Sequence, residues 1–223
     1  LFLRAREVRA LRAFAAKHRL TYSDGDPGGI IDPAFALFRQ GVGRSCADGL
    51  TGVWEELAVR AAHYSYYTVS TDPKTNRTTK TTFHFTVLMT SLAVIAPAIT
   101  ITRLDWLGGI LHDFGVHGIE FESEAFNRRF QVTCEDQAFA FRLIDPRMME
   151  WLMSLGVACT LEFRAGTLLV AVNQDVAAAH LGPLFDVAPA FKNHVPRLVW
   201  REYGHPASPI AAISTTSGQP AGK

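Results

Sequence analysis

Two groups of side chains near the middle of the sequence have the composition of a chemical site. The first combines imidazoles and carboxylates at His112, His117, Glu120 and Glu122. Such groups can hold a divalent cation or transfer protons. The two histidines are five positions apart, however, whereas ligands that share one helix face stand four apart. Glu120 and Glu122 alternate with apolar residues, as on the solvent side of a strand. We therefore expect a solvated strand face, and a small metal-dependent or acid-base hydrolase is the alternative function.

The second group is basic and comprises Arg128, Arg129 and Arg147. Guanidinium groups match the geometry of carboxylates and phosphates, so these residues could bind an anionic head group or an acidic peptide of a partner. We favour internal ion pairs and keep anion or partner binding by the three arginines as the alternative. The acidic residues nearby in sequence are Glu122, Glu124, Glu135 and Glu150.

The commonest catalytic and nucleotide-binding motifs are absent from the sequence. It contains no phosphate-binding P-loop, GxGxxG, GxSxG, HExxH or calcium-binding loop. Its three cysteines, Cys46, Cys134 and Cys159, stand far apart without a CxxC pair, so we expect neither a disulfide framework nor a structural zinc site. The sequence therefore predicts no catalytic residue, no cofactor and no bound metal.

The charge of the chain is unevenly distributed. The whole sequence carries a net charge of +1, but residues 1–20 hold six basic side chains and one acidic one, a net of +5 that leaves −4 for the remainder. Aromatic residues at Tyr64, Tyr66 and Tyr67 could stack on nucleic-acid bases, but such platforms also need a basic groove. Because the body is acidic, we expect no nucleic-acid partner.

The first residues favour a membrane context. Leu1-Phe2-Leu3 is apolar and is followed by the basic segment, as in a chain that leaves a bilayer on its positive side. We therefore predict an upstream transmembrane helix and a domain on the cytoplasmic face of the membrane; an ordinary exposed helix of a cytoplasmic protein is the alternative. Binding of anionic lipid head groups by residues 1–19 is a further hypothesis.

Hydrophobic periodicity in the first half predicts one helix and a long hairpin. Residues 4–18 combine alanines with an apolar stripe, which is typical of a helix. Residues 54–69 and 79–89 are rich in aromatic and β-branched side chains and predict two antiparallel strands, joined by the polar turn 70–78. Residues 41–52, which contain four glycines, predict a loop.

The second half predicts strands followed by helices. Residues 119–123 and 128–134 have strand patterns, and 136–144 a helical one. Asp145 is a good N-cap and Pro146 a good first residue for the next helix.

The end of the chain predicts one more hairpin and two helices, at 160–163 with 168–172, at 175–184 and at 195–203. We therefore predict an α+β fold with a mainly antiparallel sheet, a long hairpin and helices packed on one side. Residues 1–20 are expected to be a basic helical stalk or juxtamembrane segment, residues 21–204 a single domain, and residues 205–223 a disordered tail.

Two stretches give the sequence a family resemblance. With ESEAFNRRF at 122–130 and DPRMMEWL at 145–152, it resembles a family of uncharacterised bacterial proteins that are often membrane-anchored. Residues 20–22 and 200–204 are also similar. The resemblance implies one or two membrane spans ahead of the domain and no agreed reaction, cofactor or catalytic residue. We expect a non-enzymatic cytoplasmic domain that is tethered to the inner membrane and acts as a protein-interaction or sensing module.

Overall fold

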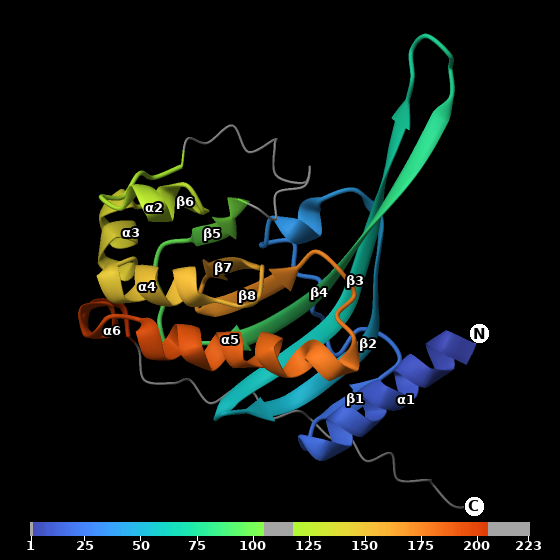
Figure 1. The fold of residues 1–223 in the computed structure, drawn as a ribbon, viewed down its shortest axis with the longest axis horizontal. Helices are drawn as coiled ribbons and strands as arrows, with labels where there is room; N and C mark the ends of the chain where they lie inside the picture. Colours follow the sequence, from blue (N-terminus) through green and yellow to red (C-terminus); the bar gives the residue numbers. More distant parts are fainter. Residues whose placement is uncertain (1, 105–117, 205–223) are drawn as a thin grey trace, which may run out of the picture.

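An antiparallel sheet forms the centre of the protein. The computed structural model describes residues 2–104 and 118–204, and within them eight strands follow the order β1-β2-β3-β4-β8-β7-β5-β6. The predicted α+β fold with an antiparallel sheet and helices on one side is confirmed, as is the single domain (Figure 1). The strands are β1 (Thr21–Ser23), β2 (Val42–Trp54), β3 (Leu57–Thr71), β4 (Thr78–Ser91), β5 (Ile99–Arg103), β6 (Phe130–Cys134), β7 (Thr160–Arg164) and β8 (Thr167–Val172).

The helices cover one face of this sheet and bury the main core against it (Figure 1). Phe185 and Phe191 of α5 and Leu11 of α1 are fully buried there, beside strand residues such as Leu88 and Val170. No described helix is long and apolar enough to cross a membrane. The helices are α1 (Phe2–Lys17), α2 (Glu124–Asn127), α3 (Gln137–Leu143), α4 (Pro146–Ser154), α5 (Leu181–His194) and α6 (Arg197–Tyr203), with short 3-10 turns η1 (Leu37–Arg39) and η3 (Ala178–His180).

A smaller core lies on the opposite face of the sheet. Phe35 and Phe38, from the segment around η1, are buried against Tyr64 and Phe85 of the central strands. The ring of Phe38 meets that of Tyr64 edge-on, with centroids 4.9 Å apart. Tyr64 and Tyr66 of β3 are therefore buried inside the protein, whereas Tyr67 is partly exposed.

Several predicted elements are confirmed because their signals are local. The hairpin β7–β8 turns at Ala165 and Gly166, both with positive φ. Asp145 caps α4 by accepting a hydrogen bond from the backbone N of Met148 at 2.8 Å, and Pro146 is the first helical residue.

Three predictions were wrong. The helix predicted at 175–184 begins only at Leu181, after η3, and continues to His194 as α5. Residues 41–52 were predicted to be a loop, but residues 42–52 belong to β2. Their glycines and Asp48 adopt left-handed or bulged conformations within a strand that pairs with β3. The pairing register shifts between Val42 and Ser45 and again between Ala47 and Leu50. Residues 119–123 form no strand. They run irregularly before α2, and only Ile119 bonds to β6, through Val132 at 2.8 Å.

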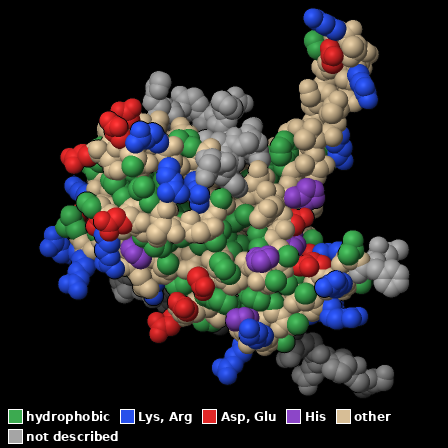
Figure 2. Space-filling model, viewed as in Figure 1, with side chains coloured by type: hydrophobic (Ala, Val, Ile, Leu, Met, Phe, Trp, Pro, Cys, Tyr) green, Lys and Arg blue, Asp and Glu red, His purple; other side chains and the backbone are tan. Residues whose placement is uncertain are grey.

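The β3–β4 hairpin extends beyond the body of the protein as a two-stranded arm, defined here as residues 68–82 (Figure 1). Every one of these residues is exposed. In Figure 2 the arm is mostly tan, the colour of the backbone and of side chains that are neither charged nor hydrophobic, with basic groups along it and an acidic group near its tip. Its tip is ordered by Asp72, which accepts a hydrogen bond from the backbone N of Lys74 at 2.8 Å, and by Asn76 with a φ of 53°.

Candidate functional site

A buried carboxylate joins the N-terminal helix to the sheet. Asp48 lies at the β2 bulge with a φ of 56°, and its side chain is 1% exposed. Its two oxygens accept hydrogen bonds from Arg4 of α1 at 2.5 and 2.8 Å, from the Tyr22 hydroxyl of β1 at 2.7 Å and from His63 Nδ1 of β3 at 3.0 Å. A carboxylate offers about four acceptor sites, so these four bonds use all of them. Asp48 therefore holds α1 in place and has no free oxygen site for a proton or a metal.

The electrostatics of this cluster favour an ionised Asp48. Burial opposes ionisation, but the hydrogen bonds from Arg4, Tyr22 and His63 outweigh it and lower the pKa of Asp48 below its usual value. The bond to Asp48 raises the pKa of Arg4. Burial, together with the neighbouring carboxylate, raises the pKa of the Tyr22 hydroxyl. At neutral pH the cluster is thus an Arg4–Asp48 ion pair supported by two further donors.

His63 links this cluster to the segment that precedes η3. Its Nε2 lies 3.1 Å from the carbonyl oxygen of Val176. Because the Asp48 carboxylate and this carbonyl both accept, the two bonds form together only when each ring nitrogen carries a proton. The same segment is held by Thr86, which accepts from Val176 N at 2.7 Å, and by Glu7 of α1, which accepts from Ala178 N at 2.8 Å.

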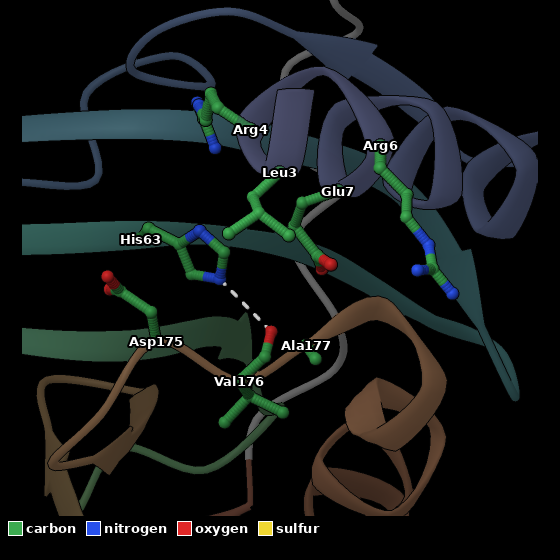
Figure 3. Close-up of a pocket in the computed structure, with 8 residues that line it drawn as sticks. All are labelled: Leu3, Arg4, Arg6, Glu7, His63, Asp175, Val176 and Ala177. Atoms are coloured by element: carbon green, nitrogen blue, oxygen red, sulfur yellow. Dashed lines mark hydrogen bonds between the residues drawn. The ribbon is translucent and has the colours of Figure 1, made fainter. Parts of the chain in front are cut away.

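An open pocket of about 560 Å³ lies beside this junction, between α1 and the segment before η3 (Figure 3). Figure 3 shows Glu7, His63 and Asp175 around it, with Leu3 pointing in from α1. The pocket has both acidic and basic walls, so it offers no strong preference for the charge of a ligand. The lining residues are Leu3, Arg4, Arg6, Glu7, His63, Asp175, Val176 and Ala177.

A second and larger hollow of about 850 Å³ lies at the other end of the sheet. We call it the acidic groove. Its walls come from the irregular segment before α2, the end of α3 and one side of α4. Apolar side chains alternate with four carboxylates, and Phe141 is 46% exposed. The groove is lined by Glu120, Phe121, Glu122, Ser123, Phe141, Ile144, Asp145, Pro146, Met149, Glu150 and Met153.

The comparisons with known proteins concern the part of the chain that holds this groove. Residues 91–195 match the family described as Protein of unknown function (DUF3137). The acidic groove lies entirely inside the DUF3137 match, whereas Arg4, Tyr22, Asp48 and His63 precede it.

Among solved structures, the chain is similar to the crystal structure of the mycobacterial trehalose monomycolate transport factor A, TtfA. The TM-score is 0.57 at 14% sequence identity, and the alignment covers 85% of this chain and 96% of that one. At this identity the likeness shows the fold alone. A comparison with curated proteins gave no match.

The three predicted arginines lie on or next to α2 and α4, within the residues that match DUF3137. Their side chains have different neighbours and do not form one site. Arg128 is exposed at the C-terminal end of α2, and Arg147 is exposed in the first turn of α4. Arg129 donates to the carbonyl oxygen of Met153 at 3.3 Å. In the described part of the chain, none of the three forms the expected ion pair with a nearby glutamate. Anion or partner binding by these arginines stays a prediction.

The predicted acid-base cluster is described only in part. His112 and His117 lie outside the described residues. Glu120 and Glu122 are exposed, and they line the acidic groove instead of an open strand face. Within residues 2–104 and 118–204, no three His, Cys, Asp or Glu side chains are placed to hold one metal ion.

Sequence reasoning missed the Asp48 cluster altogether. Its members come from α1, β1, β2 and β3, and the bonds to Asp48 span 44, 26 and 15 positions. The one local signal is an Asp-Gly pair at 48–49, because Asp is among the few residues that tolerate a left-handed conformation. That signal was hidden because the surrounding glycines indicated a loop.

Proposed function

We propose that this chain is a non-enzymatic domain that binds a protein partner at the cytoplasmic face of a membrane, with the β3–β4 arm as its main contact. The observation that carries this proposal is the exposure of all residues from 68 to 82 within an ordered hairpin. A two-stranded ribbon without a core adds little to the stability of a fold. A ribbon of this length therefore favours a role outside the fold, in contact with another molecule.

The arm offers unpaired backbone groups to such a partner. The β3–β4 ladder continues to the pair Thr71 and Thr78, but β2 pairs with β3 only as far as Tyr67, and β8 pairs with β4 only from Thr86 onwards. Among the described residues, no strand pairs with the outer edge of β4 over residues 78–84. An added strand from a partner can bond to such an edge. Lys80, which lies 3.7 Å above the Tyr67 ring, places a charge on this edge and disfavours pairing between identical edges.

The N-terminal helix supports the membrane part of the proposal. Arg4 holds α1 against the sheet, while Arg6, Arg9 and Lys17 of the same helix are exposed to solvent. Basic side chains in this position are attracted to the anionic lipids of a cytoplasmic leaflet. The similar fold of TtfA, which is named as a transport factor, is in keeping with a binding role.

The arm can be tested by crosslinking and competition in cells. A photo-crosslinking residue at Thr79 should give a discrete adduct with a protein of the membrane fraction, whereas the same residue at Glu55, exposed in the β2–β3 turn, should not. An untagged domain in which residues 69–80 are replaced by Asn-Gly keeps a two-residue hairpin turn after Thr68 and should fold. The intact domain should compete for the Thr79 adduct, and the armless domain should not. Equal competition by both would overturn the role of the arm.

The membrane contact can be tested separately with vesicles. The purified chain should float with vesicles that contain about one third anionic lipid, and less so when Arg6, Arg9 and Lys17 are changed to serine. These three side chains make no contact with Asp48, so the variant should remain folded. Unchanged flotation would contradict the role of the basic face.

A further inference from the structure

We propose that the acidic groove binds a basic amphipathic helix of the partner protein. This inference rests on the proposed interaction function and deepens it, because it adds a second contact and states the chemistry of the segment that fits there. It is carried by three properties of the groove, namely its apolar floor, the charge of its rim and the arrangement of its carboxylates.

The floor of the groove is a helical stripe that the core covers only in part. α4 turns Met148 and Leu152 into the main core, where both are fully buried. Its neighbouring face places Pro146, Met149 and Met153 along the groove. Their spacing of three and four residues puts them on one side of the helix.

Opposite this stripe, the groove exposes aromatic surface. Phe141 is 46% exposed although its ring packs edge-on against Phe121, with centroids 5.2 Å apart. Methionine side chains adapt to different partners because they are flexible and polarisable. An apolar floor of this kind fits the hydrophobic face of a helix.

The rim selects for positive charge. Glu120, Glu122 and Glu150 are exposed, and in the described part of the chain none of them forms an ion pair. Among the described residues, no Lys or Arg lines the groove. Like charges around one hollow repel one another, so a ligand that brings cations between them is favoured. Arg129 bonds to the Met153 carbonyl next to the groove but is not part of its lining.

The arrangement of these carboxylates favours an extended cation over a metal ion. No three of the described acidic side chains converge on a point where one ion could be held. Asp145 already accepts the hydrogen bond that caps α4. The negative charges are therefore spread along the border of the groove. This spacing suits a partner helix whose lysines or arginines are spread along its length.

The test uses the purified full chain and a dye-labelled peptide of roughly 18 residues, long enough to form a helix, with leucines at i, i+3, i+4 and i+7 and lysines elsewhere. Fluorescence anisotropy should show saturable binding that weakens as salt is added. The double variant Glu122→Gln, Glu150→Gln should weaken binding about tenfold, and Phe141→Ser by a similar factor. Neither change removes a buried side chain, and circular dichroism should show an unchanged fold.

Matched controls separate the groove from the general acidity of the body. Glu55→Gln with Glu56→Gln makes the same change in charge at the exposed β2–β3 turn and should leave the affinity within about twofold. A scrambled peptide of equal composition should bind much more weakly than the amphipathic one. Equal binding of both peptides, or equal loss in both double variants, would overturn the inference, as would the absence of saturable binding at about 100 µM.

The outcome can be distinguished from that of the arm experiment. If the Thr79 adduct and its competition are as expected but the peptide does not bind, the groove inference alone is wrong. If the peptide binds at the groove but the armless domain competes fully, the arm is not the main contact, and the groove inference stands.

Discussion

The two acidic regions of the protein differ in how their charges are compensated. At the junction of α1 with the sheet, one buried carboxylate, Asp48, receives four hydrogen bonds from Arg4, Tyr22 and His63. Around the acidic groove, Glu122 and Glu150 face solvent without an ion pair among the described residues. In the first region, the charge of Asp48 is compensated by side chains of the same chain. In the second region, the charges of the glutamates are available to another molecule.

This difference shows why acidic residues should be judged by their partners and not by their spacing. A buried charge costs several kcal/mol unless it is paired, so Asp48 must have its donors for the protein to fold. An exposed carboxylate loses little solvation and needs no partner within the chain. The glutamates of the groove are therefore free to contribute to binding at little cost in folding stability.

The largest effect is expected for Asp48→Asn. Asparagine tolerates the left-handed conformation at this position, so the backbone should be preserved while the charge is lost and an amide NH2 faces several donors. We expect a loss of about 3 kcal/mol in the free energy of unfolding, measured by urea denaturation of the full chain. A loss below about 1 kcal/mol would show that the cluster contributes no more than an exposed ion pair.

The same cluster should make stability sensitive to acid. The pKa of Asp48 is lower in the folded chain than its ordinary value of 3.8, so its contribution is present above that pH and is lost as the pH falls through the folded-state pKa. The difference in stability between wild type and Asp48→Asn should therefore narrow as the pH is lowered from about 5 to about 2. Denaturation curves across this range measure it, and a constant difference would contradict an ionised Asp48.

Glu162 lies outside both regions. It is buried like Asp48 but receives fewer hydrogen bonds, so it tests whether the number of donors decides the effect of a buried carboxylate on stability. It is 4% exposed and accepts from the backbone N of Ala36 at 3.1 and 3.2 Å, and its pKa is raised above 4.5 by burial. A raised folded-state pKa means that stability is greatest below 4.5 and is lost as the pH rises through that pKa. Glu162→Gln removes the buried charge and keeps an acceptor for Ala36.

We expect Glu162→Gln to stabilise the protein by up to about 1 kcal/mol at pH 7, with the gain disappearing near pH 4. Thermal unfolding at the two pH values measures this. A clear loss of stability at pH 7 would show instead that the ion pair with Arg164, at 3.7 Å, outweighs the cost of burial.

The smallest effect is expected in the groove. Glu122→Gln with Glu150→Gln should change the free energy of unfolding by no more than about 0.5 kcal/mol, because both side chains are exposed. Thermal unfolding beside Glu55→Gln with Glu56→Gln provides the comparison. A loss above about 1 kcal/mol would place these glutamates with Asp48 as structural residues.

The parts of the fold that could be predicted from the sequence are those set by neighbouring residues. The β3–β4 and β7–β8 hairpins and the cap of α4 at Asp145 follow from alternation, turn residues and an N-cap that lie within a few positions. β2 could not be predicted, because its glycines favour a loop until β3 pairs with it.

The candidate sites show the same limit. Glu120 and Glu122 were identified from the sequence, but their place in a groove depends on α3 and α4, which lie further along the chain. Asp48 gave almost no local signal because Arg4, Tyr22 and His63 meet it only in the folded protein. Long-range contacts of this kind are decided by topology and not by residue spacing.

The arm also has a consequence for how the protein can vary. Because residues 68–82 pack against no core, one residue can be added to each strand of the arm without changing which side chains face the body. Each such step would lengthen the arm by about 3.4 Å. The reach of the domain can thus be adjusted in small increments, and the tip at residues 72–77 is a suitable place to insert a fluorescent or affinity label.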